Sequence, residues 1–274
     1  MRTLIIGEIH GADIALNQCL ERANFDFEKD QLIALGDFVD GWENTYEVIE
    51  TLLKVKNFIG IMGNHDLEFL DWIETGVNRW GWKHGSDATA RSYAKHAGIN
   101  LHIENGIANL NIINIPQSHI KFFKSLHYYY VDDENRGFVH GGFISKLGLG
   151  NDPHPTDYCW DRDMWHLALG FDGNENIGLE TTKSQRFRKH KEVFIGHTAT
   201  TNWKYKWNGV LRIMNGHNKV GQTITTPIQA CNVWNLDTGA GWNGKLTIMD
   251  VDTKKYWQSD LVQEIFPSGG RKKR

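Results

Sequence analysis

The chain has 274 residues, which is enough for one large domain or two small ones, and its 40% hydrophobic content can form a substantial core. A formal net charge of -3 argues against broad electrostatic attraction to nucleic acid or membranes. Three widely separated cysteines without a Cys-x-x-Cys pair argue against a disulfide framework or a thiolate zinc site. The apolar run at residues 4–6 is too short for a signal peptide, so we expect a cytoplasmic protein.

Over its first 75 residues the chain repeats a pattern of apolar strand, polar loop and helix three times. Apolar runs at residues 3–6, 31–35 and 58–62 predict strands. Each is followed by apolar residues at helical spacing: Ile14, Leu16, Cys19 and Leu20, then Tyr46, Val48, Ile49, Leu52 and Leu53, then Leu67, Phe69, Leu70 and Ile73. This pattern predicts crossover units in an α/β sheet, whose ligands bind beyond the carboxyl ends of the strands.

The remainder of the chain predicts both helices and strands. A helix is predicted over residues 86–96 with Ser86 as its N-cap, and another follows Pro116. Residues 128–131 and 137–140 flank a polar turn and predict a hairpin. Further strands are predicted at residues 193–195, 233–236 and 246–251, the last followed by a hairpin turn.

No linker or internal repeat divides the chain, so we predict a single domain over residues 1–265. The Gly- and Pro-rich beginning of residues 141–170 and the polar, Trp-bearing residues 200–228 predict lids or excursions from that domain. The basic end, residues 266–274, predicts a disordered tail rather than a strong nucleic-acid signal.

Tryptophan is abundant, with 11 residues, and several of these lie close together in the sequence. The groups are Trp72, Trp80 and Trp82; Trp160 and Trp165; and Trp203 and Trp207. Core and lid packing is the simpler interpretation. The alternative is a stacking surface for a nucleobase or another aromatic group of a substrate.

Short polar clusters stand at the ends of five predicted strands: GEIHG, GDFVDG, GNHD, VHGG and GHT. They supply carboxylate, amide and imidazole groups but no sulfur, from Glu8, His10, Asp37, Asp40, Asn64, His65, His140 and His197. A single Asp after a strand usually caps a turn, but five such clusters indicate a metal site. The donor set suits Mn²⁺, Fe or Zn²⁺, and two ions about 3.5–4 Å apart could bind both sides of a displacement at phosphorus.

In order, these clusters resemble the metal motifs of the calcineurin-like metallophosphoesterase superfamily. The resemblance is closest to the branch with bacterial and bacteriophage serine/threonine phosphoprotein phosphatases and diadenosine tetraphosphatases, and it covers the chain from Arg2 to about Asp250. It implies an α/β fold with a βαβαβ start and a β-sandwich of two mixed sheets flanked by helices. It also implies that the single domain is catalytic, a metal-dependent phosphoesterase and therefore a hydrolase.

The resemblance implies a role for each residue of the clusters. The implied metal ligands are Glu8 and His10 for the first ion, Asp37 as the bridge, and Asn64, His140 and His197 for the second ion. His65, oriented by Asp40, would be the general acid, and a metal-bound hydroxide would be the nucleophile. The cofactors would be two divalent metal ions, with Mn²⁺ as the first choice and Fe or Zn²⁺ as alternatives.

The chain departs from the phosphoprotein phosphatases where those enzymes carry two arginines that grip phosphate. Gly41 and Met62 stand at these positions. Arg162, in CWDRDMW, resembles the phosphate arginine of related bacterial and phage enzymes; alternatively, it is a surface residue paired with Asp161 or Asp163. Weaker phosphate binding leaves room for nucleotide substrates.

The largest departure is Glu8, where the family has Asp. One more methylene displaces the carboxylate by roughly an ångström unless the backbone retreats. Restoring aspartate there is therefore expected to raise turnover or the affinity for the first metal.

We predict a dinuclear-metal-dependent phosphoesterase that hydrolyses phosphomonoesters of protein or of small molecules. One alternative is a nucleotide phosphohydrolase acting on a dinucleoside polyphosphate or a cyclic nucleotide. Another alternative is a phospho-ligand binding protein in which Glu8, in place of Asp, weakens catalysis. The intact His65 and Asp40 pair favours an enzyme. The expected partner is a phosphorylated substrate, with no membrane.

Overall fold

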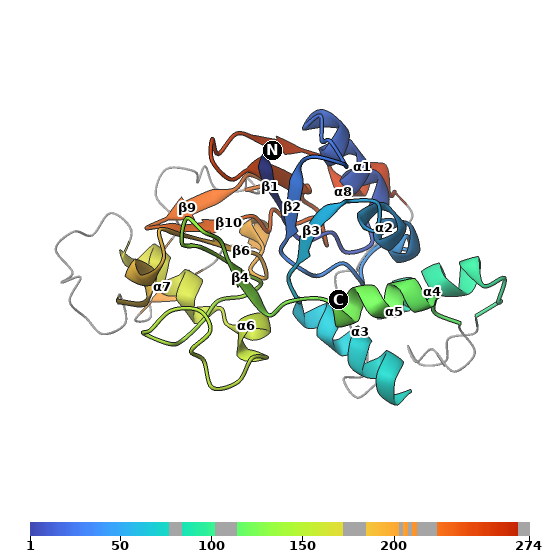
Figure 1. The fold of residues 1–274 in the computed structure, drawn as a ribbon, viewed down its shortest axis with the longest axis horizontal. Coiled ribbons are helices and arrows are strands. Elements are labelled where there is room, and N and C mark those ends of the chain that lie inside the picture. Colours follow the sequence, from blue (N-terminus) through green and yellow to red (C-terminus); the bar gives the residue numbers. More distant parts are fainter. Residues whose placement is uncertain are drawn as a thin grey trace.

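In the computed structural model, two five-stranded sheets pack face to face and helices cover their outer faces (Figure 1). The structure describes residues 1–76, 84–101, 114–171, 185–202, 205–207, 210–212 and 224–267. The α/β sandwich of two mixed sheets implied by the motifs is thereby confirmed.

The first sheet contains the three strands at the start of the chain. Its order is β12-β11-β1-β2-β3. The strands are β1 (Thr3–Ile6), β2 (Gln31–Ala34), β3 (Asn57–Gly60), β11 (Thr247–Asp250) and β12 (Tyr256–Gln258). β1, β2 and β3 are parallel because α1 (Asp13–Arg22) and α2 (Thr45–Leu52) cross over between them, as the repeated pattern predicts. β11 pairs antiparallel with both β1 and β12, which confirms the hairpin at that end.

The second sheet is built from the later part of the chain, in the order β4-β5-β6-β10-β9. Its strands are β4 (Tyr129–Val131), β5 (Arg136–Val139), β6 (Glu192–Ile195), β9 (Ile228–Ala230) and β10 (Val233–Asn235). β4 and β5 form the predicted antiparallel hairpin, whereas β5, β6 and β10 run parallel. A separate antiparallel pair consists of β7 (Tyr205–Trp207) and β8 (Val210–Arg212).

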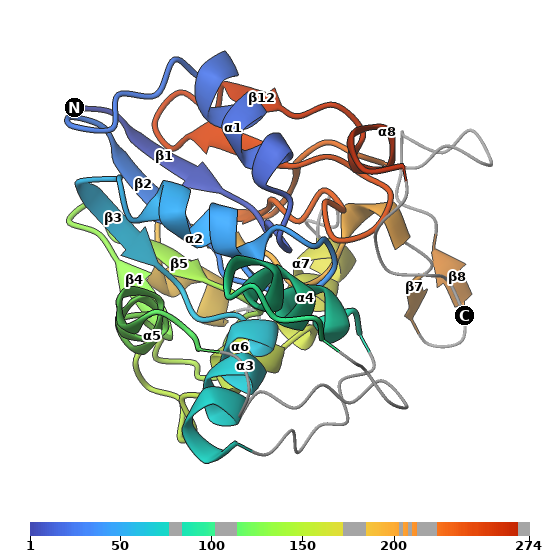
Figure 2. The same cartoon turned by 90° about the vertical axis from the view of Figure 1, so that its right-hand side faces the viewer.

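Alternation along β1 shows how the layers are held together. Leu4 and Ile6 pack with the core under α1 and α2, whereas Ile5 packs between the two sheets with Phe138 and Phe194. Figure 2 shows α1 and α2 lying over the β1, β2 and β3 strands. The fold therefore has four layers, in the order helices, first sheet, second sheet, helices. A strand in such a fold is covered on both sides, so it needs large apolar residues on both of its faces.

The remaining helices complete the outer layers. They are α3 (Asn64–Thr75), α4 (Ser86–His96), α5 (Gln117–Lys124), α6 (Asp157–Trp160), α7 (Asp163–Phe171) and α8 (Val262–Ile265), with 3-10 turns at Gln185–Lys189 and Thr200–Asn202. α4 packs on α2, and α5 packs on α3. The predicted N-cap of α4 is wrong by one residue, because Gly85 adopts the left-handed conformation (φ 92°) and Ser86 is already helical.

Two predicted excursions contain regular structure. Within residues 141–170, α7 buries Met164 and Trp165 against the outer face of the second sheet. The second predicted excursion, residues 200–228, includes β7 and β8. Its residues 203–204, 208–209 and 213–223 lie outside the described residues, and so does the tail from residue 268. The boundaries of the single domain remain a prediction.

The tryptophans divide between core and surface. Trp42, Trp72 and Trp165 are buried, which agrees with core packing, whereas Trp160 is 44% exposed. Trp80, Trp82 and Trp203 lie outside the described residues.

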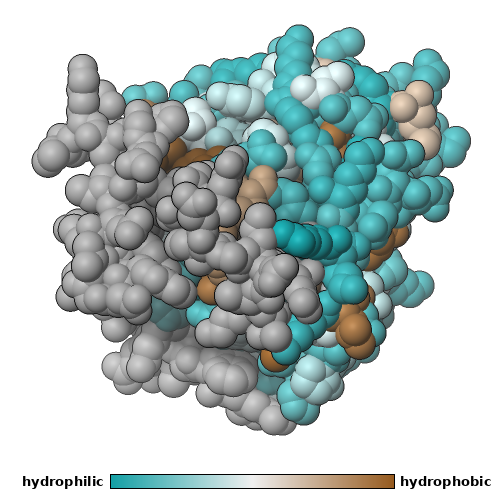
Figure 3. Space-filling view, turned by 90° about the vertical axis from the view of Figure 1, so that its left-hand side faces the viewer, coloured by the Kyte–Doolittle hydropathy of each residue, from teal (hydrophilic) through white to brown (hydrophobic). Residues whose placement is uncertain are grey.

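The described surface is mainly polar on the face shown in Figure 3, where hydrophobic residues form small separate groups. Among the residues that the structure describes, no helix combines the length and apolarity needed to cross a membrane.

Candidate metal centre

The polar clusters meet at the carboxyl ends of parallel strands from both sheets. β1, β2 and β3 end two, three and four residues before Glu8, Asp37 and Asn64, while β5 and β6 lead into His140 and His197. Because the strands in each group are parallel, their ends lie at one edge. All of these side chains are buried, so the folded chain concentrates carboxylates and imidazoles where there is little water.

Glu8, His10 and Asp37 form the first donor group, with one ligand atom from each within 4.8 Å of the others. His10 Nε2 lies 3.1 Å from Glu8 Oε2 and 3.6 Å from Asp37 Oδ2. His10 Nδ1 lies 2.9 Å from the Val39 carbonyl oxygen, which can only accept a hydrogen bond. Nδ1 therefore carries a proton, and Nε2 is the ring nitrogen that faces the carboxylates.

Glu8, His140 and His197 form the second donor group, again within 4.8 Å. His140 Nδ1 donates to the Leu35 carbonyl oxygen at 2.7 Å, which leaves Nε2 as the basic nitrogen. This Nε2 lies 3.2 Å from Asn64 Oδ1 and 3.5 Å from Asp37 Oδ2. Asn64 therefore lies beside the second group, although its amide is outside the triad.

Asp37 lies between the two groups. Its Oδ2 is 3.6 Å from His10 Nε2 and 3.5 Å from His140 Nε2, while its Oδ1 accepts a hydrogen bond from the backbone nitrogen of His65 at 3.0 Å. One oxygen is thus shared between the donor groups and the other holds the orientation of the carboxylate. This is the geometry that a bridging ligand requires.

Backbone strain concentrates at the same loops. The described chain has eight non-glycine residues with positive φ, and His10 (50°), Asp37 (54°), Asp40 (65°) and His197 (64°) are four of them. Such conformations cost about 1–3 kcal/mol each and persist where the surrounding structure enforces them, typically at functional sites. Half of these residues therefore lie in three of the five loops that carry the polar clusters.

His65 and Asp40 form a buried pair next to these groups. His65 Nδ1 lies 2.7 Å from Asp40 Oδ2, and Asp40 Oδ1 accepts a hydrogen bond from the Thr89 hydroxyl at 2.9 Å. Thr89 Oγ1 also accepts from the Asp40 backbone nitrogen at 2.8 Å. Thr89 belongs to α4, and no sequence signal marked it as part of the site.

Asp66, the last residue of the GNHD cluster, is a second supporting residue to which the motif assigns no role. Its carboxylate accepts hydrogen bonds from the backbone nitrogens of Asp37 (2.6 Å), Phe38 (2.8 Å) and Gly63 (3.0 Å). It therefore ties the loop after β2 to the start of α3. Its place as the third residue of a helix, where acidic side chains accept backbone hydrogen bonds, was the available signal.

Burial sets the protonation of the donors. Desolvation lowers the pKa of His140 and lowers that of His197 well below its ordinary value, so both imidazoles are neutral and keep a lone pair. Burial by itself raises the pKa of Glu8, but the His10 hydrogen bond and the nearby imidazoles lower it below its ordinary value. An ionised carboxylate between neutral imidazoles is the state that binds a cation.

His197 provides a test of whether this donor set fits divalent ions. Within the part of the chain that the structure describes, its Nε2 is buried with no hydrogen-bond partner. Buried polar atoms rarely lack a partner, and a cation would provide one. Together with the oxygen and nitrogen donors of both groups, this atom fits a divalent metal centre of the Mn²⁺, Fe or Zn²⁺ type.

Arg162 and Trp160 lie beside His197. The Arg162 guanidinium donates hydrogen bonds to the His197 carbonyl oxygen and, at 3.1 Å, to Thr198 Oγ1. The rings of Trp160 and His197 are nearly perpendicular, with centroids 6.1 Å apart. A guanidinium group and an exposed indole ring therefore lie next to the second donor group.

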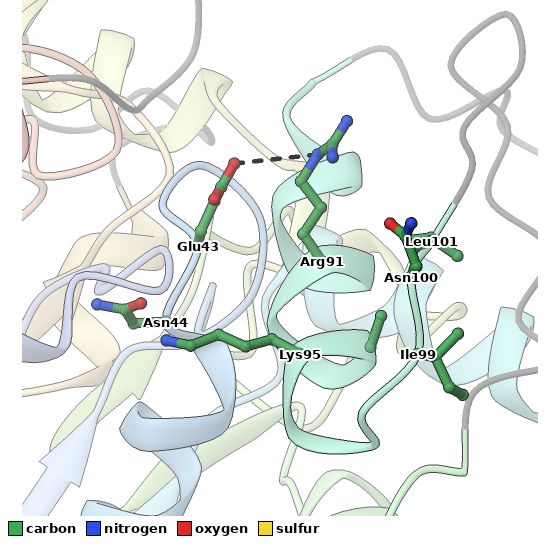
Figure 4. Close-up of a pocket in the computed structure, with 8 residues that line it drawn as sticks. Glu43, Asn44, Arg91, Lys95, Ile99, Asn100 and Leu101 are labelled. Carbon is green, nitrogen blue, oxygen red and sulfur yellow. Dashed lines mark ion pairs between the residues drawn. The ribbon is translucent and has the colours of Figure 1, made fainter.

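A separate hollow of about 260 Å³ lies between α4 and the loop that precedes α2 (Figure 4). Arg91 and Lys95 line it, but their charges face Glu43 at 3.9 Å and Glu47 at 3.8 Å. None of the residues of the polar clusters contributes to its lining. This hollow is therefore separate from the two donor groups at the strand ends.

Gly63 offers a test of how tightly the loops are packed. A Cβ at this position would collide with the carboxylate and backbone nitrogen of Asp37. We expect Gly63→Ala to lower the free energy of unfolding by about 1–3 kcal/mol, measured by urea denaturation. Gly170→Ala is the control, because a Cβ on this α7 residue meets nothing within 4 Å and should leave stability unchanged or slightly higher. Equal stability of both variants would contradict the packing described for Gly63.

Comparison with known proteins establishes the class. The family model of calcineurin-like phosphoesterases matches residues 1–220. The chain belongs to this family and is a metal-dependent phosphoesterase, a hydrolase. The predicted family and enzyme class are confirmed.

More specific similarity is to enzymes named symmetrical bis(5'-nucleosyl)-tetraphosphatase. Those from several Coxiella burnetii strains are 24% to 38% identical to this chain. The protein of strain Dugway 5J108-111 is 38% identical over 275 residues, covering 92% of this chain and 89% of that protein. The enzyme of the same name from Pseudomonas entomophila is 24% identical and covers 97% of this chain and 96% of its own length.

Solved structures support the fold. A metallophosphoesterase from Sphaerobacter thermophilus has a TM-score of 0.53 at 15% identity, covering 95% of this chain and 89% of that chain. A protein serine/threonine phosphatase from Saccharomyces cerevisiae has a TM-score of 0.50 at 12% identity, covering 95% and 79%.

Proposed function

We propose that this chain hydrolyses dinucleoside polyphosphates, with symmetrical cleavage of bis(5'-nucleosyl) tetraphosphate as its reaction. The similarity of nearly the whole chain to enzymes of that name, at up to 38% identity, carries this proposal. The sequence alone favoured phosphomonoesters and kept dinucleoside polyphosphates as an alternative, and it is the alternative that the relatives support. A cytoplasmic location fits a nucleotide substrate and stays a prediction.

The donor groups supply the proposed metal assignment. Glu8 and His10 would hold a first ion, Asp37 would bridge, and Asn64, His140 and His197 would hold a second ion. The group would be two divalent ions, with Mn²⁺ as the first choice and Fe or Zn²⁺ as alternatives. Such ions would neutralise charge on the phosphoryl oxygens and lower the pKa of water, so that hydroxide is available to attack phosphorus. The protein's part is to fix both sets of donors before substrate arrives.

His65 is the proposed general acid. Its Nδ1 donates to Asp40, so the proton to be transferred would be carried on Nε2. The Asp40 carboxylate stabilises the imidazolium form and fixes the ring, and Thr89 fixes Asp40 in turn. Protonation of the departing nucleotide oxygen would avoid the expulsion of a more highly charged anion.

Arg162 and Trp160 supply two further contacts suited to a nucleotide. The Arg162 guanidinium lies at the His197 loop, where it can bind phosphate oxygens of the substrate. The exposed indole of Trp160 offers a face on which a nucleobase can stack. A phosphomonoester without a base would gain nothing from this indole.

The substrate assignment is tested by a panel assayed in Mn²⁺. We expect diadenosine tetraphosphate to give ADP as the only nucleotide product, with the highest kcat/KM among the compounds tried. The comparison compounds are a phosphopeptide, a cyclic nucleotide and p-nitrophenyl phosphate. A phosphopeptide turned over with the higher kcat/KM would overturn the assignment and restore the phosphomonoester alternative.

Trp160→Ala is expected to raise KM for diadenosine tetraphosphate by roughly 5- to 150-fold, because base stacking on an aromatic side chain is worth about 1–3 kcal/mol. KM for glycerol 2-phosphate, which has no aromatic ring, should change far less. Trp160→Phe is the matched control, since it keeps a stacking face and should recover most of the affinity. Equal changes for both substrates would show that Trp160 does not contact the base.

A further inference from the structure

The two carboxylate oxygens of Glu8 point to different donor groups. Oε2 lies 3.1 Å from His10 Nε2, in the first group. Oε1 lies 3.8 Å from His140 Nε2 and accepts a hydrogen bond from the backbone nitrogen of His197, in the second group. Glu8 is accordingly the one residue common to both triads of donors, Glu8–His10–Asp37 and Glu8–His140–His197.

The surroundings hold Oε1 in this position. Glu8 is 6% exposed, and a Cβ on Gly196 would lie 3.1 Å from Oε1, so a side chain larger than glycine there would press on the carboxylate. The His197 backbone nitrogen, immediately after this glycine, donates to the same oxygen. An aspartate at position 8 would be shorter by one methylene, roughly an ångström of reach, and could not reach both groups from the same backbone.

We propose that Glu8 is a second carboxylate bridge, which contributes Oε2 to the first metal and Oε1 to the second, beside the bridge through Asp37. This inference rests on the metal centre proposed above. It gives a reason for the longer side chain, because the extra methylene brings one oxygen to the His140 and His197 side. The sequence alone predicted that Glu8→Asp would strengthen metal binding. The second bridge predicts the opposite, that Glu8→Asp weakens it.

The test is a calorimetric titration of the full-length protein with Mn²⁺. His10→Asn and His197→Asn first identify which binding step belongs to which ion, because each removes a ligand of one ion only. We expect Glu8→Asp to weaken both steps at least tenfold. Weakening of only the step lost in His10→Asn would overturn the second bridge and leave the metal centre intact. A parent protein that does not bind two ions per chain would overturn the metal centre itself.

Gly196→Ala provides an independent variant that keeps every proposed ligand. The added methyl should displace Oε1 and weaken the His197 step several-fold, while the His10 step stays within about twofold of the parent. Circular dichroism of each variant checks that the fold is preserved, so that a loss of binding is read only from folded protein. Unchanged affinity at both steps in folded Gly196→Ala would show that Oε1 does not contribute to the second ion.

Discussion

Replacement of His65 by asparagine is expected to lower turnover of diadenosine tetraphosphate by about 10²–10⁴-fold, the range for loss of a general acid. The imidazole is buried and its Nδ1 is held by Asp40 at 2.7 Å, so its orientation is fixed before substrate binds. Asparagine can keep a hydrogen bond to Asp40 but has no proton of suitable acidity to transfer. Steady-state kinetics with Mn²⁺ in excess would measure the effect.

The choice of leaving group separates proton transfer from a structural role. The loss in His65→Asn should be much smaller with p-nitrophenyl esters, because nitrophenolate leaves without protonation. Asp40→Asn should show the same dependence on leaving group with a smaller loss, since it only orients and stabilises the imidazole. Equal losses for good and poor leaving groups would mean that His65 supports the fold and does not donate the proton.

Asp37→Asn is expected to remove both metal ions at micromolar Mn²⁺ and to reduce turnover to near the background rate. One Asp37 oxygen lies 3.6 Å from His10 Nε2 and 3.5 Å from His140 Nε2, so the negative charge serves both donor groups. An amide keeps the shape but removes that charge. Elemental analysis of desalted protein should give about two ions per chain for the parent and fewer than one for the variant.

Asp87→Asn is the matched control for this substitution. Asp87 lies in the first turn of α4 with its side chain half exposed, and it pairs with Arg91 at 3.8 Å. The same loss of charge at this position should leave metal content and turnover at the parental level. Two ions per chain in Asp37→Asn would contradict the proposed bridge.

Local patterns were sufficient to predict the parallel strands and helices at the start of the chain. The apolar runs ending at Ile6 and Leu35 and the helical spacing between them predict β1, α1 and β2, because strand and helix periods are properties of a few consecutive residues. Parallel strands joined by crossovers place their carboxyl ends together. The meeting of Glu8, Asp37 and Asn64 therefore follows from sequence order alone.

Exposure could not be predicted for two neighbouring tryptophans. Trp165 is fully buried on α7 and Trp160 is 44% exposed beside His197, although both lie in one short polar and aromatic stretch. Whether an aromatic residue is core or surface depends on which sheet covers it, and the second sheet is assembled from distant segments. The packing of α7 onto that sheet was missed for the same reason.

The sequence by itself determined the class of the protein and the set of donor residues, because the motifs are short and each is complete within a few positions. Only the tertiary structure decided how the side chains of those donors are oriented. Thr89 holds Asp40 across 49 positions of the chain, and the His197 backbone holds Glu8 across 189. Hydrogen bonds between residues so far apart leave no local pattern, since they depend on how two sheets and α4 pack. The orientation of the Glu8 carboxylate is therefore a property of the folded chain alone.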